Sequence, residues 1–166
     1  MVEPKPYSQI TTQRTLIEGV KTKSLRVIPD ERGWLMEILR SDEHDLFSTF
    51  GQVYVSATYP GVVKAWHYHK EQVDNFACVS GMVKLVLVDT RPKSPTEGTV
   101  NELFIGDQNP TLVQVPCLVY HGWKCISTGP SLVVNVPSTP YRHADPDEYR
   151  VDAHGTLPYD WTRKDG

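Results

Sequence analysis

The stretch VYVSATYPGVVKAWHYHKEQVDNFACVSGMVKLVLVD, residues 53–89, contains four short runs rich in valine, aromatic and other strand-favouring residues. Residues 53–59 alternate, with valine and alanine on one face and Tyr54, Ser56 and Thr58 on the other. A period of two is that of a half-buried strand. Pro60-Gly61 and Ser80-Gly81 supply turn-forming residues between the runs. The stretch therefore predicts successive β-strands.

The rest of the chain repeats this pattern, and helix signals are few. A short helix is expected only at residues 41–50, with Ser41 as its cap, and the tail from residue 145 predicts a turn of helix followed by loop. About ten strands without helical crossovers predict an all-β domain, either an antiparallel barrel or a jelly roll. An open immunoglobulin-like sandwich is the alternative, but its Cys…Trp…Cys framework is absent. The further strand-like runs are 24–28, 34–40, 100–105, 111–115, 123–127 and 132–136.

Length and composition limit the function. A chain of 166 residues with 39% hydrophobic and 22% charged residues predicts one globular domain over residues 1–166, ending in a tail at 142–166. The net charge of -3 gives no electrostatic case for a nucleic acid polymer or an anionic membrane. No run approaches the roughly 18 apolar residues that a membrane span needs, and the N-terminus does not resemble a signal peptide. Three cysteines without a CxxC pair predict reduced thiols in the cytoplasm.

The candidate site starts from two histidines one residue apart. On an extended chain His67 and His69 point to the same face. Asp74 follows after an expected turn, and a returning hairpin strand would bring its carboxylate near the pair. His121 lies five residues after Pro116, where another predicted strand ends.

These residues resemble the motifs of cupin barrels. Gly61, the pair His67 and His69, Asp74 and Gly81 have the spacing of the first cupin motif, with aspartate in place of the usual glutamate. Pro116 and His121 are similar to the second motif, in which Leu118 replaces the usual glycine. Metal-binding cupins use the two histidines, the acid and the late histidine as ligands. That resemblance implies that His67, His69, Asp74 and His121 hold Fe, Mn, Zn or Ni.

A second resemblance covers most of the chain. Residues 30–37 (DERGWLME), 61–67 (GVVKAWH), 89–98 (DTRPKSPTEG), 115–123 (VPCLVYHGW) and 157–161 (LPYDW) are similar, in order, to motifs of the dTDP-4-dehydrorhamnose 3,5-epimerase family. That family uses the cupin barrel without a metal. The resemblance implies a cytoplasmic, cofactor-free epimerase or isomerase of polysaccharide biosynthesis. Its substrate would be a nucleotide-linked 4-keto-6-deoxy sugar, with dTDP as the expected nucleotide. It also implies a homodimer, with residues 1–30 at the contact.

The resemblance assigns roles to individual residues. His67 is expected to be the base, which suits imidazole because its pKa lies near neutrality. Aligning the last family tyrosine on Tyr141 puts Asn135 where the family has its acid tyrosine, and the family lysine falls near Asp74. Without that phenol, a single-centre epimerisation or a keto shift is expected more readily than double inversion. The expected catalytic residues are His67, His69, Asp74 and Asn135, and the expected substrate-binding residues are Lys64, Trp66, His121 and Tyr141.

Alternative interpretations remain open from the sequence. The segment from His67 to Lys70, with Phe76, Cys78 and Gly81, is also similar to the dTDP-sugar 3,4-ketoisomerases. A metal-binding cupin enzyme or sensor and a catalytically silent nucleotide-sugar-binding relative are the other candidates. Single residues also have more modest interpretations: Trp66 suits a core aromatic, and Asp74 suits the end of a turn or an ion pair with Lys70.

Overall fold

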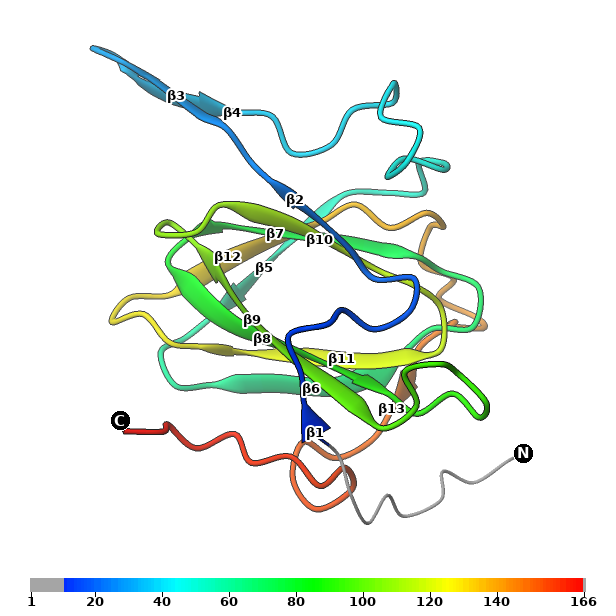
Figure 1. Cartoon of the computed structure of the whole chain (residues 1–166). Coiled ribbons are helices and arrows are strands. Elements are labelled where there is room, and N and C mark those ends of the chain that lie inside the picture. Colours follow the sequence, from blue (N-terminus) through cyan, green and yellow to red (C-terminus); the bar gives the residue numbers. More distant parts are fainter. Residues whose placement is uncertain (1–10, 166) are drawn as a thin grey trace.

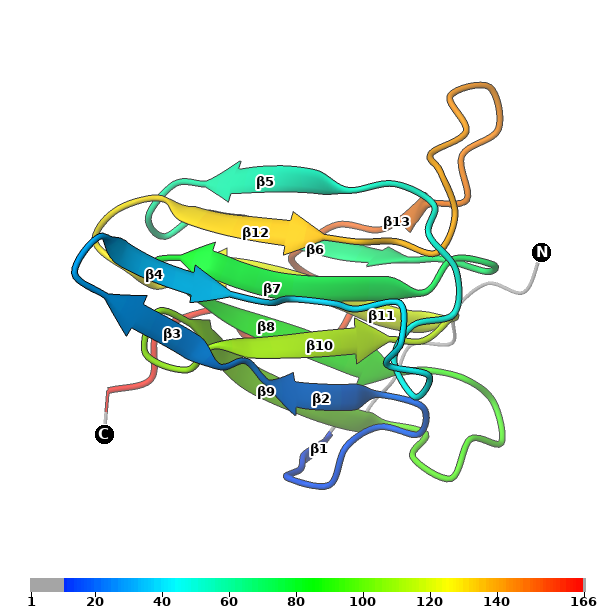
Figure 2. The ribbon, with the colours of Figure 1, turned by 90° about the horizontal axis from the view of Figure 1, so that it is seen from above.

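The computed structural model describes residues 11–165, in which two large β-sheets pack face to face beside a separate two-stranded sheet, without a helix (Figure 1). The six-stranded sheet has the order β1-β9-β8-β11-β6-β13, and the five-stranded sheet has the order β2-β10-β7-β12-β5. Figure 2 shows the five-stranded sheet from above, with β3 and β4 in front of the left-hand ends of its strands. The strands are β1 (Thr11–Thr12), β2 (Lys21–Ser24), β3 (Val27–Asp30), β4 (Gly33–Met36), β5 (Tyr54–Thr58), β6 (Val63–Tyr68), β7 (Asp74–Ser80), β8 (Met82–Asp89), β9 (Thr99–Gly106), β10 (Thr111–Val115), β11 (Val119–Cys125), β12 (Ser131–Asn135) and β13 (Tyr149–Arg150).

Strand β8 shows how the sequence builds the core. Leu85 and Leu87 face the space between the two sheets, where they join the main hydrophobic cluster. Val86 and Val88 point to the other side of the sheet, where Trp161 of the C-terminal tail covers them. Because both faces are covered, β8 reads as a nearly continuous apolar run, as strands buried on two sides do.

The connection between β6 and β7 differs from the expected hairpin. β6 pairs with β11 and β13 in one sheet, whereas β7 pairs with β10 and β12 in the other. Residues 69–73 therefore cross from sheet to sheet. The Asp147 carboxylate holds this crossing by accepting the backbone N–H groups of Lys70, Glu71 and Gln72 at 2.9, 2.8 and 3.0 Å. As a result, Asp74 faces the histidines across the core instead of beside them.

The predicted helix at residues 41–50 is wrong, because this segment forms turns. Two of its carbonyl groups accept hydrogen bonds from side chains of the barrel: Asp45 from Lys21, and Leu46 from Gln114. A segment of this length gains little from helix formation alone, so such tertiary contacts decide its shape. The helical turn expected in the tail is also absent from residues 145–165, where bends precede β13 and a turn follows it.

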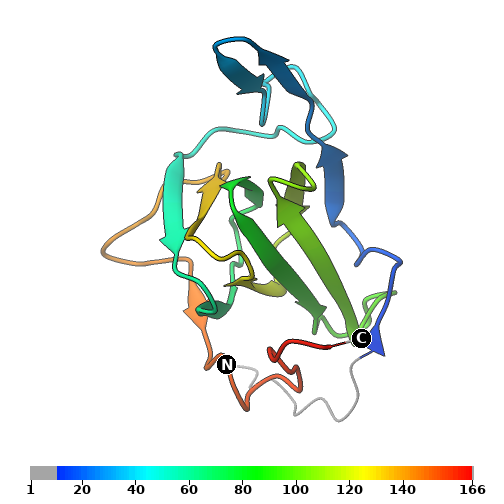
Figure 3. The same cartoon turned by 90° about the vertical axis from the view of Figure 1, so that its left-hand side faces the viewer.

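The expected strand at residues 24–28 is split between two elements. β2 ends at Ser24 and stays in the five-stranded sheet, while β3 starts at Val27 and pairs only with β4. The β3–β4 hairpin projects from the body of the barrel (Figure 3). No helix in the described part of the chain is long and apolar enough to cross a membrane.

Candidate active site

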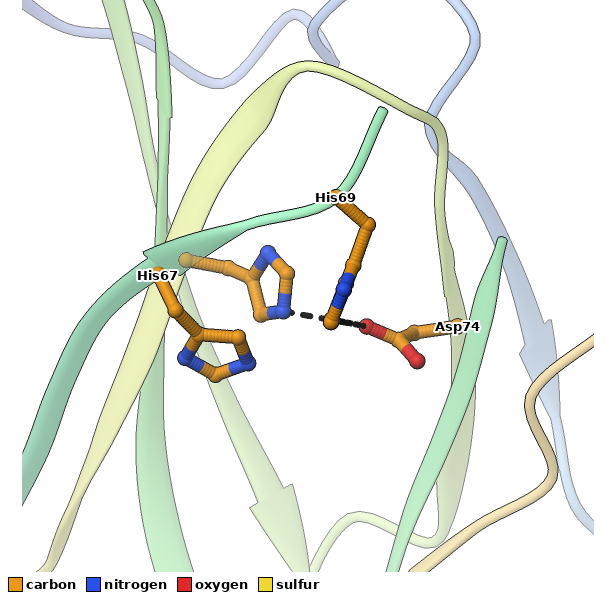
Figure 4. Close-up of side chains that lie close together, drawn as sticks. His67, His69 and Asp74 are labelled. Carbon is orange, nitrogen blue, oxygen red and sulfur yellow. Dashed lines mark ion pairs between the residues drawn. The ribbon is translucent and has the colours of Figure 1, made fainter. Parts of the chain in front are cut away.

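Four polar side chains meet between the sheets. His67 comes from β6, and His69 directly follows the end of that strand. His121 comes from β11, where it lies directly opposite His67 in the strand register. Asp74 enters from β7 in the other sheet (Figure 4). One donor atom of each residue lies within 4.8 Å of those of the other three. The structure thus brings together the four residues that the sequence singled out.

Asp74 is the centre of the cluster and is only 1% exposed. Its Oδ2 atom lies 3.2 Å from His69 Nε2 and 3.1 Å from His121 Nε2. Its Oδ1 atom accepts hydrogen bonds from the side-chain amides of Gln72 and Asn135, both at 2.8 Å. Burial alone would raise the pKa of Asp74, but the neighbouring His121 and His69 outweigh it and hold that pKa well below its usual range. The buried carboxyl is therefore ionised at neutral pH.

Backbone carbonyls fix how His69 and His121 present their rings. His69 Nδ1 contacts the carbonyl oxygen of Asp147, and His121 Nδ1 lies 3.0 Å from the carbonyl oxygen of Val119. Because a carbonyl only accepts, each Nδ1 carries its hydrogen and donates. In the neutral tautomer, Nε2 of each ring is then a lone-pair donor that faces Asp74. Burial lowers the pKa of His69, but Asp74 and Asp147 together outweigh it and raise that pKa above its usual value.

His67 differs from the other two histidines. Its side chain is half-buried and makes no hydrogen bond to another residue within 11–165, and its ring centroid lies 4.1 Å from that of His121. Burial, and after it the proximity of His121, lowers the pKa of His67 well below its ordinary value. The imidazole is therefore neutral at pH 7 and can accept a proton, as a general base must.

Tyr54 is a site residue that the sequence reasoning missed. It lies opposite Asn135 in the β5–β12 register, and its Oη accepts a hydrogen bond from Asn135 Nδ2 at 2.9 Å. Burial, and next the Asp74 charge, raise the pKa of the phenol to about 12. Thr58, on the same face of β5, accepts the indole N–H of Trp123 in the core. The period-two alternation of residues 53–59 placed Tyr54 on the same face as Thr58, although it did not show which face points inward.

The remaining expected site residues make no hydrogen bond to the cluster within residues 11–165. Lys64 Nζ donates to Ser56 Oγ at 2.7 Å and to the Ala57 carbonyl at 2.6 Å, which joins β6 to β5. Tyr141 is 45% exposed in the loop after β12.

Trp66 requires a correction. It points to the outer face of β6, is 1% exposed, and packs against Trp161 at 4.8 Å between ring centroids. It is a core aromatic and does not line the site.

A pocket of about 460 Å³ lies on the outer side of the six-stranded sheet, next to the C-terminal tail. Lys84, Lys124 and Trp161 line it, and none of the four clustered residues does. This pocket is not the candidate active site, because the histidines and the aspartate that could transfer protons lie between the two sheets.

The comparisons with known proteins agree with this arrangement. The family model described as dTDP-4-dehydrorhamnose 3,5-epimerase matches residues 14–164. The chain belongs to the dTDP-4-dehydrorhamnose 3,5-epimerase family. As a member of this family it is a sugar-nucleotide epimerase, so the prediction of an enzyme of this kind is confirmed.

Two curated relatives match most of the chain. The probable low-salt glycan biosynthesis epimerase Agl13 of Haloferax volcanii is 40% identical over 145 residues, which are 87% of this chain and 89% of that protein. The spore coat polysaccharide biosynthesis protein SpsL of Bacillus subtilis is 36% identical over 147 residues, which are 88% of this chain and 97% of SpsL.

Solved structures in the epimerase family have the same fold. The dTDP sugar isomerase of Desulfovibrio desulfuricans G20 superimposes with a TM-score of 0.83 at 34% identity, and covers 90% of this chain and 94% of its own. NovW of Streptomyces spheroides, a 4-keto-6-deoxy sugar epimerase, gives a TM-score of 0.77 at 26% identity, with 98% and 83% covered. The prediction of an all-β, cupin-type jelly roll is confirmed.

Proposed function

We propose that this epimerase acts on a nucleotide-linked 4-keto-6-deoxy sugar by removing a proton from a carbon next to the ketone. The observation that carries the proposal is the His67 imidazole, neutral and half-buried between the sheets of an epimerase fold. NovW, which is named for such a substrate, shares the fold at 26% identity. The names of Agl13 and SpsL support a role in glycan or polysaccharide biosynthesis.

The first step uses His67 as the base. The neighbouring ketone acidifies the C–H bonds at C3 and C5 of such a sugar. A ring nitrogen of His67 takes the proton from carbon. The electron pair of the broken C–H bond then moves toward the C4 oxygen, which gives an enolate. Within the folded chain, the enolate needs a hydrogen-bond donor or a positive charge to be formed at a useful rate.

Tyr54 supplies the second half of an inversion. It belongs to β5 of the five-stranded sheet, whereas His67 belongs to β6 of the six-stranded sheet, so the two side chains approach a bound sugar from opposite walls. The phenol keeps its hydrogen at neutral pH because its pKa is about 12. Its oxygen already accepts a hydrogen bond from the side-chain amide of Asn135. Tyr54 donates its proton to the carbon while the enolate returns to a ketone. The phenolate and the imidazolium then re-equilibrate with solvent.

This assignment supplies a proton donor, which the sequence did not offer because Asn135 stands where the family has its acid tyrosine. The phenol stands on β5, beside position 135, and Tyr54 is 38% exposed, so a ligand can reach it. One base and one acid on opposite walls support inversion at a single centre.

Deuterium exchange tests the proposal. dTDP-4-keto-6-deoxyglucose in D₂O, followed by NMR, is expected to incorporate deuterium at C3 or C5 with inversion in the wild type. His67→Asn should abolish incorporation. Tyr54→Phe should keep incorporation but lose the inverted product, because proton removal precedes the step that needs the phenol. The exposed His143→Asn variant is the matched control and should behave as wild type. Full exchange in His67→Asn would contradict the assignment.

The quaternary structure is proposed to be a homodimer. The projecting β3–β4 hairpin exposes Val27, Ile28, Trp34 and Leu35 to 39%, 45%, 59% and 58%. Apolar surface of this kind marks an interaction site, and a second copy of the chain is the proposed cover. Light scattering should give twice the chain mass for the wild type and a lower mass for Trp34→Ser. A monomer mass for the wild type at micromolar concentration contradicts the dimer.

A cytoplasmic location is also proposed, because Cys78, Cys117 and Cys125 are free thiols, which persist in reducing compartments. Cell fractionation tests it, and recovery of the protein outside the cytoplasm would contradict it.

A further inference from the structure

The pocket on the outer side of the six-stranded sheet contains a buried lysine. Lys84 comes from β8 and is 6% exposed, although lysine is rarely buried to this extent unless it has a partner. Its Nζ lies over the rings of Tyr159 and Trp161, at 5.3 and 5.6 Å from their centroids. It makes no hydrogen bond or ion pair with another residue among 11–165. The three hydrogens of this ammonium group are therefore available to a ligand in the pocket.

A second lysine lies directly opposite Lys84. In the strand register Lys84 has Lys124 of β11 on one side and Phe104 of β9 on the other. Like charges directly opposite each other on one face of a sheet destabilise it. Lys124 Nζ donates to the carbonyl oxygen of Trp161 at 2.8 Å, but a carbonyl group does not neutralise its charge. An anion between the two ammonium groups would remove the repulsion.

Positive charge dominates the lining of this pocket. Arg163 and Lys164 of the tail join the two lysines of the sheet, and Glu102 is the acid of the lining. The Glu102 carboxylate already accepts the hydroxyl hydrogen of Tyr159 and lies 3.5 Å from Lys164 Nζ. Burial lowers the pKa of Lys84, and the charge of Glu102 opposes that shift. The pocket thus attracts anions, in a chain whose net charge is -3.

The rest of the lining suits an apolar group. Phe104 is 49% exposed and Ile126 is 44% exposed, and both line the pocket beside the lysines. The volume of about 460 Å³ lies in the range of pockets that hold small organic molecules. An inorganic anion would fill the part beside the ammonium groups, whereas an anion with an apolar body would also cover Phe104.

We propose that this outer pocket binds an organic phosphate, with the phosphate group on Lys84 and Lys124 and the apolar part on Phe104. Phosphate oxygens accept charge-assisted hydrogen bonds from ammonium groups, and lysine is a common phosphate binder. The pocket lies outside the barrel, whereas His67 lies between the sheets, so this site is separate from the candidate active site and does not rest on the proposed function.

The C-terminal tail gives the site a second consequence. Figure 1 shows the tail along the outer side of the six-stranded sheet, and Trp161 of the tail lines the pocket. A ligand that contacts both the tail and β8 would hold them together. Because a ligand of the folded state stabilises that state, binding should raise the melting temperature.

Titration with phenyl phosphate tests the site directly. The purified full chain is titrated, and NMR follows the indole N–H signals of its tryptophans. The wild type is expected to show a saturable shift of the Trp161 signal and none of the Trp123 signal, which comes from the core between the sheets. Lys84→Met should weaken binding by about 10- to 100-fold, the cost of a lost hydrogen bond to a charged group.

Two further variants complete the design. Phe104→Ser should weaken the binding of phenyl phosphate and leave that of inorganic phosphate unchanged. Lys93→Met is the matched control, because Lys93 is an exposed lysine outside the pocket, and it should bind like the wild type.

Clear outcomes overturn the proposal. The site is refuted by a Trp161 signal that does not shift at millimolar phenyl phosphate, or by unchanged binding in Lys84→Met that is folded by circular dichroism. Equal affinities for phenyl phosphate and inorganic phosphate, both unchanged in Phe104→Ser, would refute the organic part of the ligand.

Deuterium exchange separates this site from the proposed function. Lys84→Met should exchange sugar protons like the wild type, and a folded Lys84→Met protein without exchange would contradict a separate site. A wild-type protein that binds phenyl phosphate in the outer pocket but exchanges no sugar proton would refute the proposed function alone.

Discussion

Replacing Asp89 by asparagine tests whether the segment DTRPKSPTEG, residues 89–98, stabilises the folded protein. Asp89 is fully buried at the end of β8. Its Oδ1 accepts from the backbone N–H and Nε of Arg91 at 3.0 and 2.8 Å. Its Oδ2 accepts from Arg91 Nη2 at 2.9 Å and from the hydroxyls of Ser94 and Thr96, both at 2.6 Å.

The pKa of Asp89 gives the magnitude. Burial would raise it, but the hydrogen bonds from Arg91, Ser94 and Thr96 lower it from 3.8 to about 2. A difference of this size between the folded and unfolded states is worth about 2 kcal/mol at neutral pH. Asparagine also turns an NH₂ group toward donors, which adds a cost of about 1 kcal/mol. We expect Asp89→Asn to lower the free energy of unfolding by about 2–3 kcal/mol at pH 7.

The sign of the pH dependence follows from the direction of the shift. A carboxyl whose pKa is lower in the folded protein stabilises it above pH 3.8, and this contribution is lost as the pH falls toward 2. Urea unfolding of wild type and variant at several pH values measures the gap between them, which should shrink over that range.

Asp30→Asn is the matched control, because Asp30 and Arg32 repeat the Asp-x-Arg pair on the exposed hairpin. It should leave stability nearly unchanged. An Asp89→Asn protein as stable as wild type, or a gap that stays constant down to pH 2, would refute this reasoning.

Three further predictions concern other parts of the barrel. Trp66→Phe should lower the free energy of unfolding by about 1–3 kcal/mol and leave KM unchanged, because the indole packs under the tail and away from the site; urea unfolding and kinetics check this. Asp147→Ala removes the acceptor of three backbone N–H groups in the β6–β7 crossing, and should lower both the melting temperature and the deuterium exchange rate. Cys78 is 2% exposed and burial raises its pKa to about 11, so a thiol reagent at pH 8 should label the half-exposed Cys117 much faster, which mass spectrometry resolves.

The sequence predicted what depends on local periodicity. The period of two placed His67 and His69 on one face, and in the structure their ring centroids lie 5.4 Å apart, with His69 directly after the end of β6. The same periodicity in residues 53–59 contained the signal for Tyr54, but it does not say which face is inside. That information comes from Trp123, which lies far along the chain and donates to Thr58.

Features that depend on distant partners were not predictable in this way. The turn expected after His69 is real, but whether β7 returns beside β6 or crosses to the other sheet depends on β10 and β12. The helix expected at residues 41–50 failed for a related reason, since Lys21 and Gln114 take its carbonyl groups.

The departures from the family pattern at positions 74 and 135 depend on each other. A buried carboxylate at 74 needs donors, and the Asn135 amide gives one hydrogen to Asp74 Oδ1 and the other to Tyr54 Oη. A tyrosine at 135 has a single hydroxyl hydrogen and cannot serve both oxygens. It would also have to fit where Asn135 is fully buried and accepts the backbone N–H of Asn75 at 3.0 Å. With aspartate at 74, the amide at 135 therefore supplies one of the two hydrogen bonds that Asp74 Oδ1 accepts. The phenol can then stand on the adjacent strand, where β5 holds Tyr54 against the same amide.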